Sequence, residues 1–86
     1  MIYIDPLRPC IPNKNWKWDY SCHLFADSID ELHEFAKKIG MRRSWFQEKR
    51  LPHYDLTAKR RQVAVGLGAI EVDMTWVKNR LRESRR

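Results

Sequence analysis

The sequence predicts one small α/β domain over residues 1–86, with about three short, mostly parallel strands covered by three to four helices. The first observation behind this prediction is that short β-rich runs occupy residues 1–4, 22–26 and 69–73. The second is that apolar residues recur at helical spacing between and after these runs. Because strands that alternate with helices favour crossover connections, we expect a largely parallel sheet.

The first strand is expected at the very start of the chain. Ile2 and Ile4 would face one side of the sheet and Tyr3 the other, and Pro6 would end the strand. Residues 6–20 then predict a long loop, which is uncommon in a compact domain and is often functional.

The helix after residue 28 has the clearest signals. Ser28 and Glu31 form a capping box, apolar residues continue at helical spacing to Ile39, and Gly40 supplies the stop. These signals together predict a helix over residues 29–39.

Shorter helical signals follow. Ser44 and Gln47 have the spacing of a second capping box, which predicts a short helix. A helix over residues 58–67 would be capped by Asp55 or Thr57. The last helix would begin after residue 73, with Asp73 or Thr75 as its cap.

The charge balance favours polyanionic partners. The formal net charge is +6 and the isoelectric point is about 9.7, which suits nucleic acid, nucleotides or an acidic protein surface. Solubility alone explains the same excess. The basic residues are dense in the last nine positions, at Lys78, Arg80, Arg82, Arg85 and Arg86. That tail is functional or is a solvated helix end.

The two cysteines and the hydropathy of the sequence indicate the cellular compartment. Cys10 and Cys22 match neither a zinc-ribbon spacing nor a disulfide framework, so free thiols are expected, with one structural disulfide as the alternative. The N-terminus lacks a signal-peptide pattern, and no apolar run is long enough for a membrane span. We therefore expect a cytoplasmic protein with no membrane partner. Its small size leaves a homo-oligomer open.

The main candidate site is the run His53-Tyr54-Asp55. In an extended segment His53 and Asp55 face the same side and Tyr54 the other, so the first and third side chains suit one pocket. The alternative is that Asp55 caps the following helix and His53 is exposed. Phosphate-loop, His-Glu-x-x-His and Gly-x-Ser-x-Gly motifs are absent from the sequence.

Arg60 and Arg61 fall in the first turns of the helix that follows. Basic residues there oppose the helix dipole, so they indicate either an anion site or an ion pair with Asp55 or a neighbouring acid. The sequence leaves both interpretations open.

Acids and histidines near strand ends complete the candidates. Asp5 follows the first strand, and ligands collect beyond strand ends in open α/β sheets. Asp27 and Asp73 also follow predicted strands and could share a cation with Asp5, or serve as caps. His23 and His33 could join His53 in a zinc site, but no close spacing supports this, so we assign no metal ligand and no cofactor.

The chain resembles the small domain-of-unknown-function family 4031, found in bacteria and their phages. The matching residues, in order, are Met1-Ile-Tyr-Ile-Asp5, His23-Leu24, Glu31-Leu-His33-x-Phe-Ala36, Gly40, Trp45-Phe46, His53-Tyr-Asp55, Arg61 and Ala64-x-x-x-Gly68-Ala69. The resemblance implies a compact bacterial or phage protein. It implies no activity and no cofactor, so it assigns no role to any of these residues.

Three functional hypotheses follow. The leading one is a binding module for a phosphate-bearing ligand, nucleic acid or nucleotide. The second is a small metal-assisted hydrolase or nuclease-like enzyme, and the third is a protein-interaction factor such as a phage modulator of a host protein. The candidate ligand-binding residues are Asp5, His23, His33, His53, Asp55, Arg60 and Arg61. Whether the protein is an enzyme is left open by the sequence.

Overall fold

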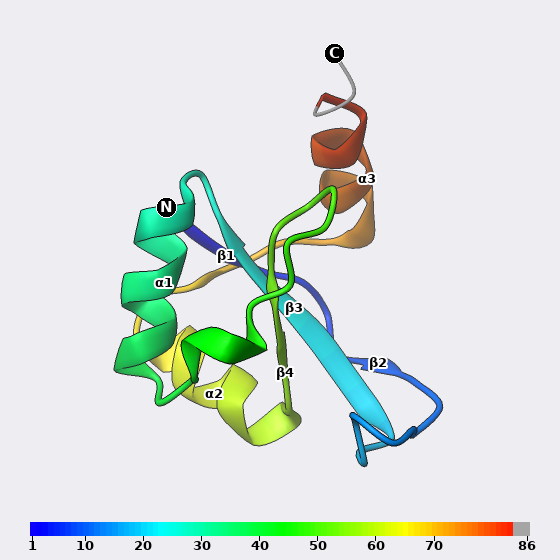
Figure 1. The fold of residues 1–86 in the computed structure, drawn as a ribbon. Coiled ribbons are helices and arrows are strands. Elements are labelled where there is room, and N and C mark those ends of the chain that lie inside the picture. The colour runs from blue at the N-terminus through cyan, green and yellow to red at the C-terminus, as the bar shows by residue number, and fades with distance from the viewer. Residues whose placement is uncertain (84–86) are drawn as a thin grey trace.

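The computed structural model describes residues 1–83, in which three strands are followed by helices that alternate with two further short strands (Figure 1). The elements are β1 (Ile2–Ile4), β2 (Arg8–Pro9), β3 (Tyr20–Ala26), α1 (Ile29–Lys38), the 3-10 turn η1 (Arg43–Trp45), β4 (Tyr54–Leu56), α2 (Ala58–Gly66), β5 (Ile70–Glu71) and α3 (Met74–Glu83). The predicted α/β class is confirmed.

The sheet is mixed and mostly antiparallel, so the prediction of a mostly parallel sheet is wrong. β3 pairs antiparallel with β1, β2 and β4, and within residues 1–83 only β1 and β5 run parallel. The described sheet has five strands rather than about three. The chain reverses through a hairpin between β2 and β3, whereas a parallel neighbour would need a crossover connection.

The segment predicted as a long loop is largely a hairpin. The backbone N–H of Cys10 donates to the carbonyl of Asp19 at 2.6 Å, which extends the β2–β3 ladder. At the tip, Asn13 Oδ1 accepts from the N–H of Asn15 at 2.8 Å and of Trp16 at 3.0 Å. Such side-chain acceptors stabilise a tight turn, so the tryptophans of this segment have a defined position.

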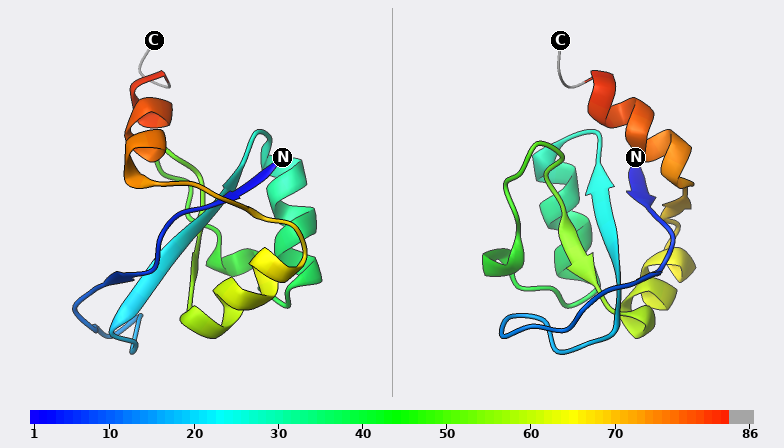
Figure 2. Two further views of the ribbon diagram at one scale, coloured as in Figure 1. Left: turned by 180° about the vertical axis from the view of Figure 1, so that it is seen from behind. Right: turned by 90° about the vertical axis from the view of Figure 1, so that its right-hand side faces the viewer.

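Helices cover both faces of the sheet (Figures 1 and 2). α1 and α2 pack on one face over the main core, whose fully buried members include Ile4, Leu24 and Tyr54. On the other face Trp76 of α3 packs against Tyr3, with 4.6 Å between ring centroids. The predicted separation of Ile4 and Tyr3 onto opposite faces is confirmed.

Local signals explain the helix starts. Ser28 Oγ accepts from the N–H of Glu31 at 3.2 Å, as the capping box predicts, and Gly40 has the expected positive φ of 80°. Thr57, not Asp55, caps α2, since its Oγ1 accepts from the N–H of Arg60. Ser44 caps nothing: it lies inside η1, whose start has no side-chain cap, so the predicted second capping box is wrong.

The capping of α3 settles another open alternative. Asp73 Oδ1 accepts from the N–H of Trp76 at 2.8 Å, so Asp73 rather than Thr75 caps this helix.

Cys10 and Cys22 are free thiols, as expected. Burial, with the nearby Asp5 carboxylate, raises the pKa of the Cys22 thiol to about 12, so this buried group stays protonated.

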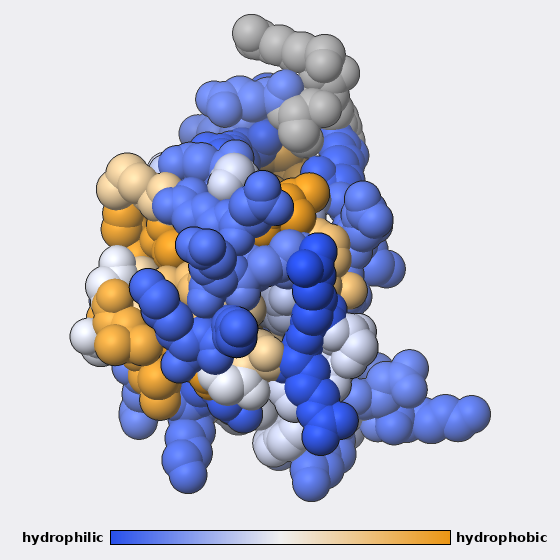
Figure 3. Space-filling model, turned by 60° about the vertical axis from the view of Figure 1, so that its left-hand side comes forward, coloured by the Kyte–Doolittle hydropathy of each residue, from blue (hydrophilic) through white to orange (hydrophobic). Residues whose placement is uncertain are grey.

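Hydrophilic residues cover most of the face seen in Figure 3, and hydrophobic residues gather toward one side of it. In the part of the basic tail that the structure describes, Arg80 has a structural role: it donates to Asp27 at 2.8 Å and lies over the Tyr3 ring. Arg85 and Arg86 lie outside the described residues. Among residues 1–83, no helix is long and apolar enough to cross a membrane.

Candidate metal centre

Three polar side chains form a row across adjacent strands on one face of the sheet. The antiparallel β1–β3 register pairs Ile4 with Leu24, and the next residue, Asp5, donates its N–H to the carbonyl of His23 at 3.2 Å. On the other side of β3, His23 is paired directly with Asp55 of β4. Because directly paired residues point to the same face, Asp5, His23 and Asp55 lie side by side.

Asp5 fixes the orientation of His23. The carboxylate of Asp5 is only 1 % exposed, and it accepts from the backbone N–H of His23 at 2.6 Å and contacts His23 Nδ1 at 2.7 Å. Since an ionised carboxylate only accepts hydrogen bonds, the proton lies on Nδ1. The neutral imidazole then presents the lone pair of Nε2 away from Asp5, towards Asp55 at 3.5 Å.

His53 is oriented in the same way by the backbone. Its Nδ1 contacts the carbonyl oxygen of Leu51 at 2.7 Å, and a carbonyl can only accept, so Nδ1 again carries the proton. Its Nε2 lies 3.4 Å from Asp55 Oδ1. His53 and Asp55 therefore share one side of the segment, as the alternation predicts, while Tyr54 points into the core.

Asp55 completes a set of three potential ligand atoms. The second carboxylate oxygen of Asp55 accepts a hydrogen bond from Gln47 Nε2, which leaves Oδ1 facing both histidines. One potential ligand atom from each of His23, His53 and Asp55 lies within 4.8 Å of the other two. Three lone pairs that face a common point repel each other, so the arrangement favours a cation between them, either a proton or a metal ion.

The separation of each histidine from Asp55 suits a four-coordinate metal. Zinc bonds to imidazole and carboxylate measure about 2.0–2.2 Å, which places tetrahedral ligands roughly 3.3–3.6 Å apart and octahedral ones roughly 3 Å apart. The Nε2–Oδ1 distances of 3.5 and 3.4 Å fall in the tetrahedral range. Imidazole and carboxylate ligands suit zinc and other divalent transition metals.

The electrostatics of the cluster agree with this geometry. The hydrogen bond that His23 donates to Asp5 raises the pKa of His23 above its ordinary value, and burial only partly opposes the shift. Burial acts to raise the pKa of Asp55, but the hydrogen bond and charge of His53, with His23 and Gln47, outweigh it and lower this pKa. The site therefore favours an ionised Asp55 and positive charge beside it.

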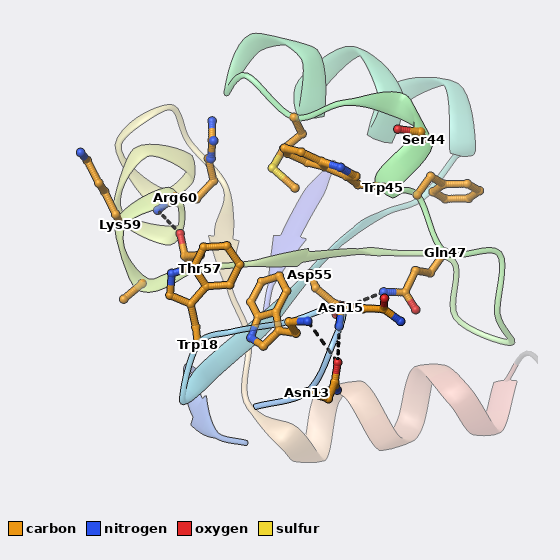
Figure 4. Close-up of a pocket in the computed structure, with 14 residues that line it drawn as sticks. Asn13, Asn15, Trp18, Ser44, Trp45, Gln47, Asp55, Thr57, Lys59 and Arg60 are labelled. Carbon is orange, nitrogen blue, oxygen red and sulfur yellow. Dashed lines mark hydrogen bonds between the residues drawn. The ribbon is translucent and has the colours of Figure 1, made fainter. Parts of the chain in front are cut away.

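The cluster is open to water at one end and borders a cleft. The His23 side chain is 43 % exposed, whereas those of Asp55 and His53 are 26 % and 13 % exposed. Asp55 and Gln47 also line a cleft of about 940 Å³, together with tryptophans from the hairpin and from η1 (Figure 4). A ligand in this cleft would have direct access to Asp55.

The other predicted site residues are dispersed. His33 Nδ1 contacts Tyr54 Oη at 2.7 Å on the core side of the sheet. Arg60 donates to the carbonyl of Ile39 at the end of α1 and also lines the cleft. Arg61 lies behind the cluster, where its Nε donates to the carbonyl of Asp5 at 3.1 Å and Nη1 pairs with Glu71 at 3.2 Å.

The three acids proposed to share a cation do not converge. Asp27 is engaged by Arg80, Tyr3 and the N-terminal ammonium group, and Asp73 caps α3. Asp5 contacts His23 instead. Within residues 1–83, the group of potential metal ligands that the structure brings together is His23, His53 and Asp55.

The contacts that support the site do not follow from the sequence pattern. The capping-box spacing predicts that Gln47 belongs to a helix, but Gln47 forms a β-bridge with His53, with N–H to carbonyl distances of 2.9 and 3.1 Å. That bridge holds the Gln47 amide beside Asp55. Pro52 is a local signal that the chain turns before His53, but nothing local specifies the register of the bridge.

A family model described as protein of unknown function (DUF4031) matches residues 2–84. No curated protein matches the chain, and no solved structure matches it.

Proposed function

Since the chain belongs to a family described only as a protein of unknown function (DUF4031), we propose its function from its own site: a small metal-dependent hydrolase. Its metal ligands would be His23 Nε2, His53 Nε2 and Asp55 Oδ1. The observation that carries the proposal is that each ligand residue has its own orienting partner: Asp5, the Leu51 carbonyl and Gln47.

Orienting partners distinguish this cluster from a chance group of surface polar residues. Metal-bound histidines usually donate their other ring N–H to a carboxylate or a backbone carbonyl, which fixes the tautomer and increases the basicity of the ligand. His23 and His53 show one example of each. Two unrelated surface histidines are not expected to present both Nε2 lone pairs to the same carboxylate oxygen.

Three protein ligands leave a coordination position for water, as in catalytic rather than structural zinc sites. A metal ion held there would supply a water molecule with a pKa near 7, and so a nucleophile at neutral pH. The protein residues would hold and orient this centre. Asp5 is a positioning residue, because it acts through His23, and the solvent-exposed edge of His23 leaves an approach for water.

The same ligand types also bind iron in oxygenases. The two separations between a histidine and the carboxylate favour the hydrolytic alternative here. The Nε2–Oδ1 distances of 3.5 and 3.4 Å exceed the roughly 3 Å expected between neighbouring ligands of an octahedral centre.

Recognition of a phosphate-bearing substrate is part of the proposal. The net charge of +6 and the basic residues Lys59 and Arg60 at the cleft support it. The two free thiols support a reducing compartment, and we propose the cytoplasm. Interaction with a host protein stays an untested hypothesis.

We expect the protein to hydrolyse a chromogenic phosphate ester only when it is loaded with metal. The test uses bis(p-nitrophenyl) phosphate, p-nitrophenyl phosphate and p-nitrophenyl acetate with chelator-treated protein, before and after addition of one equivalent of Zn²⁺, Mn²⁺ or Co²⁺. Turnover should appear with metal, disappear with chelator and be lost in His53→Ala, while His33→Ala keeps it. Turnover that is indifferent to chelator, or none with any metal and ester, would contradict the proposal.

A further inference from the structure

Aromatic side chains form two opposite sides of the cleft beside Asp55. Trp16 and Trp18 come from the hairpin between β2 and β3, and Trp45 comes from η1 (Figure 4). Trp18 and Trp45 are 43 % and 46 % exposed, although both are large apolar side chains. Exposed aromatic surface gathered in a cleft, rather than scattered singly, indicates a binding site.

The rings are held in place before any ligand binds. Trp16 Nε1 donates to the carbonyl of Tyr20 at 3.3 Å, and its ring packs edge-on against Trp18 with centroids 4.8 Å apart. The Asn13 turn fixes the tip of the hairpin behind them. On the opposite side, the guanidinium of Arg42 lies 5.7 Å from the centroid of Trp45. Little conformational freedom is then lost on binding, which favours affinity.

The charges around the cleft indicate which flat ligand would enter it. Lys59 and Arg60, from the first turn of α2, line the cleft, and Lys17 lies over the Trp18 ring at 5.2 Å. Arg60 is held by its hydrogen bond to the Ile39 carbonyl, so its charge has a fixed position. A flat ring flanked by positive charge suits a base joined to phosphate, whereas a neutral sugar would use only the aromatic rings.

We infer that this cleft binds a nucleotide unit, with the base stacked on Trp18 and Trp45 and the phosphate facing Lys59 and Arg60. This inference rests on the proposed function in one respect. Asp55 belongs to both the cleft and the metal centre, so a nucleotide in the cleft would lie beside the metal, and nucleotide phosphate esters would be the substrate class of the proposed hydrolase. The nucleotide unit has two sources, a free mononucleotide or single-stranded nucleic acid.

The test is calorimetric titration of the metal-free protein, in chelator, with adenosine 5′-monophosphate, adenosine, inorganic phosphate, glucose and a short deoxyadenosine oligonucleotide. The monophosphate should bind more tightly than adenosine or phosphate alone. Trp45→Ala should weaken it at least about fivefold, and Trp45→Phe should restore most of the loss. Lys59→Ala should weaken it and reduce its dependence on salt.

Two control variants separate the cleft from general surface effects. Tyr20→Ala removes an aromatic ring that is 49 % exposed outside the cleft, and Lys78→Ala removes an exposed charge on α3. Both should leave the affinity unchanged. If the oligonucleotide binds much more tightly than the monophosphate, single-stranded nucleic acid is the source of the nucleotide unit. If the two bind with equal affinity, the source is the free nucleotide.

Absence of monophosphate and oligonucleotide binding at low salt would overturn the inference, as would equal losses in the cleft and control variants. Binding of adenosine or glucose that is as tight as that of the monophosphate would do the same. Because the titration excludes metal, its failure leaves the hydrolase proposal to be decided by the metal-dependent assay. Failure of that assay in turn leaves nucleotide binding intact.

Discussion

Zinc affinity is expected to fall more than about 100-fold in His53→Ala, because loss of an outer partner alone typically costs 10–100-fold and this variant removes a ligand. His23→Ala and Asp55→Ala should show losses of the same order, since the three residues supply one ligand atom each. Competition with a chromogenic zinc chelator measures the affinity, and circular dichroism confirms that each variant is folded.

His33→Ala is the matched control for these variants. His33 also has a part-buried ring whose Nδ1 contacts a protein oxygen at 2.7 Å, but that oxygen is Tyr54 Oη on the core side of the sheet. Its removal should leave zinc affinity unchanged. Asp5→Asn should give an intermediate loss of about 10–100-fold, because the ligands remain and only the orientation of His23 is affected. Equal losses in His33→Ala and His53→Ala would contradict the assignment.

Tyr54→Ala is expected to lower the free energy of unfolding by about 3–5 kcal/mol, the range for truncating a large buried aromatic side chain. Tyr54 is 1 % exposed, belongs to the main core and has Phe46 and His33 as ring neighbours. A domain of this size has a total stability of only about 4–13 kcal/mol, so much of the variant could be unfolded at 25 °C. Urea unfolding followed by fluorescence measures the change.

Two substitutions give the comparison for Tyr54→Ala. Tyr54→Phe keeps the ring and loses the contact between the hydroxyl and His33, so it should cost about 1 kcal/mol. Trp45→Ala removes a larger side chain, but one that is 46 % exposed, and should change stability by no more than about 1 kcal/mol. A loss in Trp45→Ala as large as that in Tyr54→Ala would show that Trp45 is a core residue rather than a cleft wall.

The sequence predicts those features of the fold that depend on contacts between residues close together in the chain. The capping box at Ser28, the stop at Gly40 and the alternation of Ile4 and Tyr3 each depend on a few neighbouring residues, and the structure confirms them. The shared side of His53 and Asp55 follows from the same alternation.

The site itself depends on strand register, which local patterns do not specify. His23 meets Asp55 only because β3 and β4 run antiparallel in one register, and a slip of one residue would turn His23 away. The parallel sheet expected from the order of elements could not bring them together in this way. Asp5 meets His23 for the same reason, through the antiparallel β1–β3 register.

The contacts of Arg60 and Arg61 are a second feature that the sequence does not predict. Their position in the first turns of a helix indicates two alternatives, an anion site or an ion pair with a neighbouring acid. The structure has both side chains hydrogen-bonded to backbone carbonyls, of Ile39 and Asp5, that lie 21 and 56 positions away in the chain. Contacts over such separations require the tertiary fold, and they leave Arg60 at the cleft and Arg61 behind the metal centre.

X-ray absorption spectroscopy of the protein loaded with one equivalent of Zn²⁺ tests the metal centre most directly. We expect one tightly bound zinc per chain, with two imidazole ligands and the remaining positions filled by oxygen at about 2.0–2.2 Å. A sulfur ligand at about 2.3 Å would place the metal on Cys10 or Cys22 instead. That result, or the absence of imidazole scattering, would contradict the assignment of His23, His53 and Asp55 as the metal site.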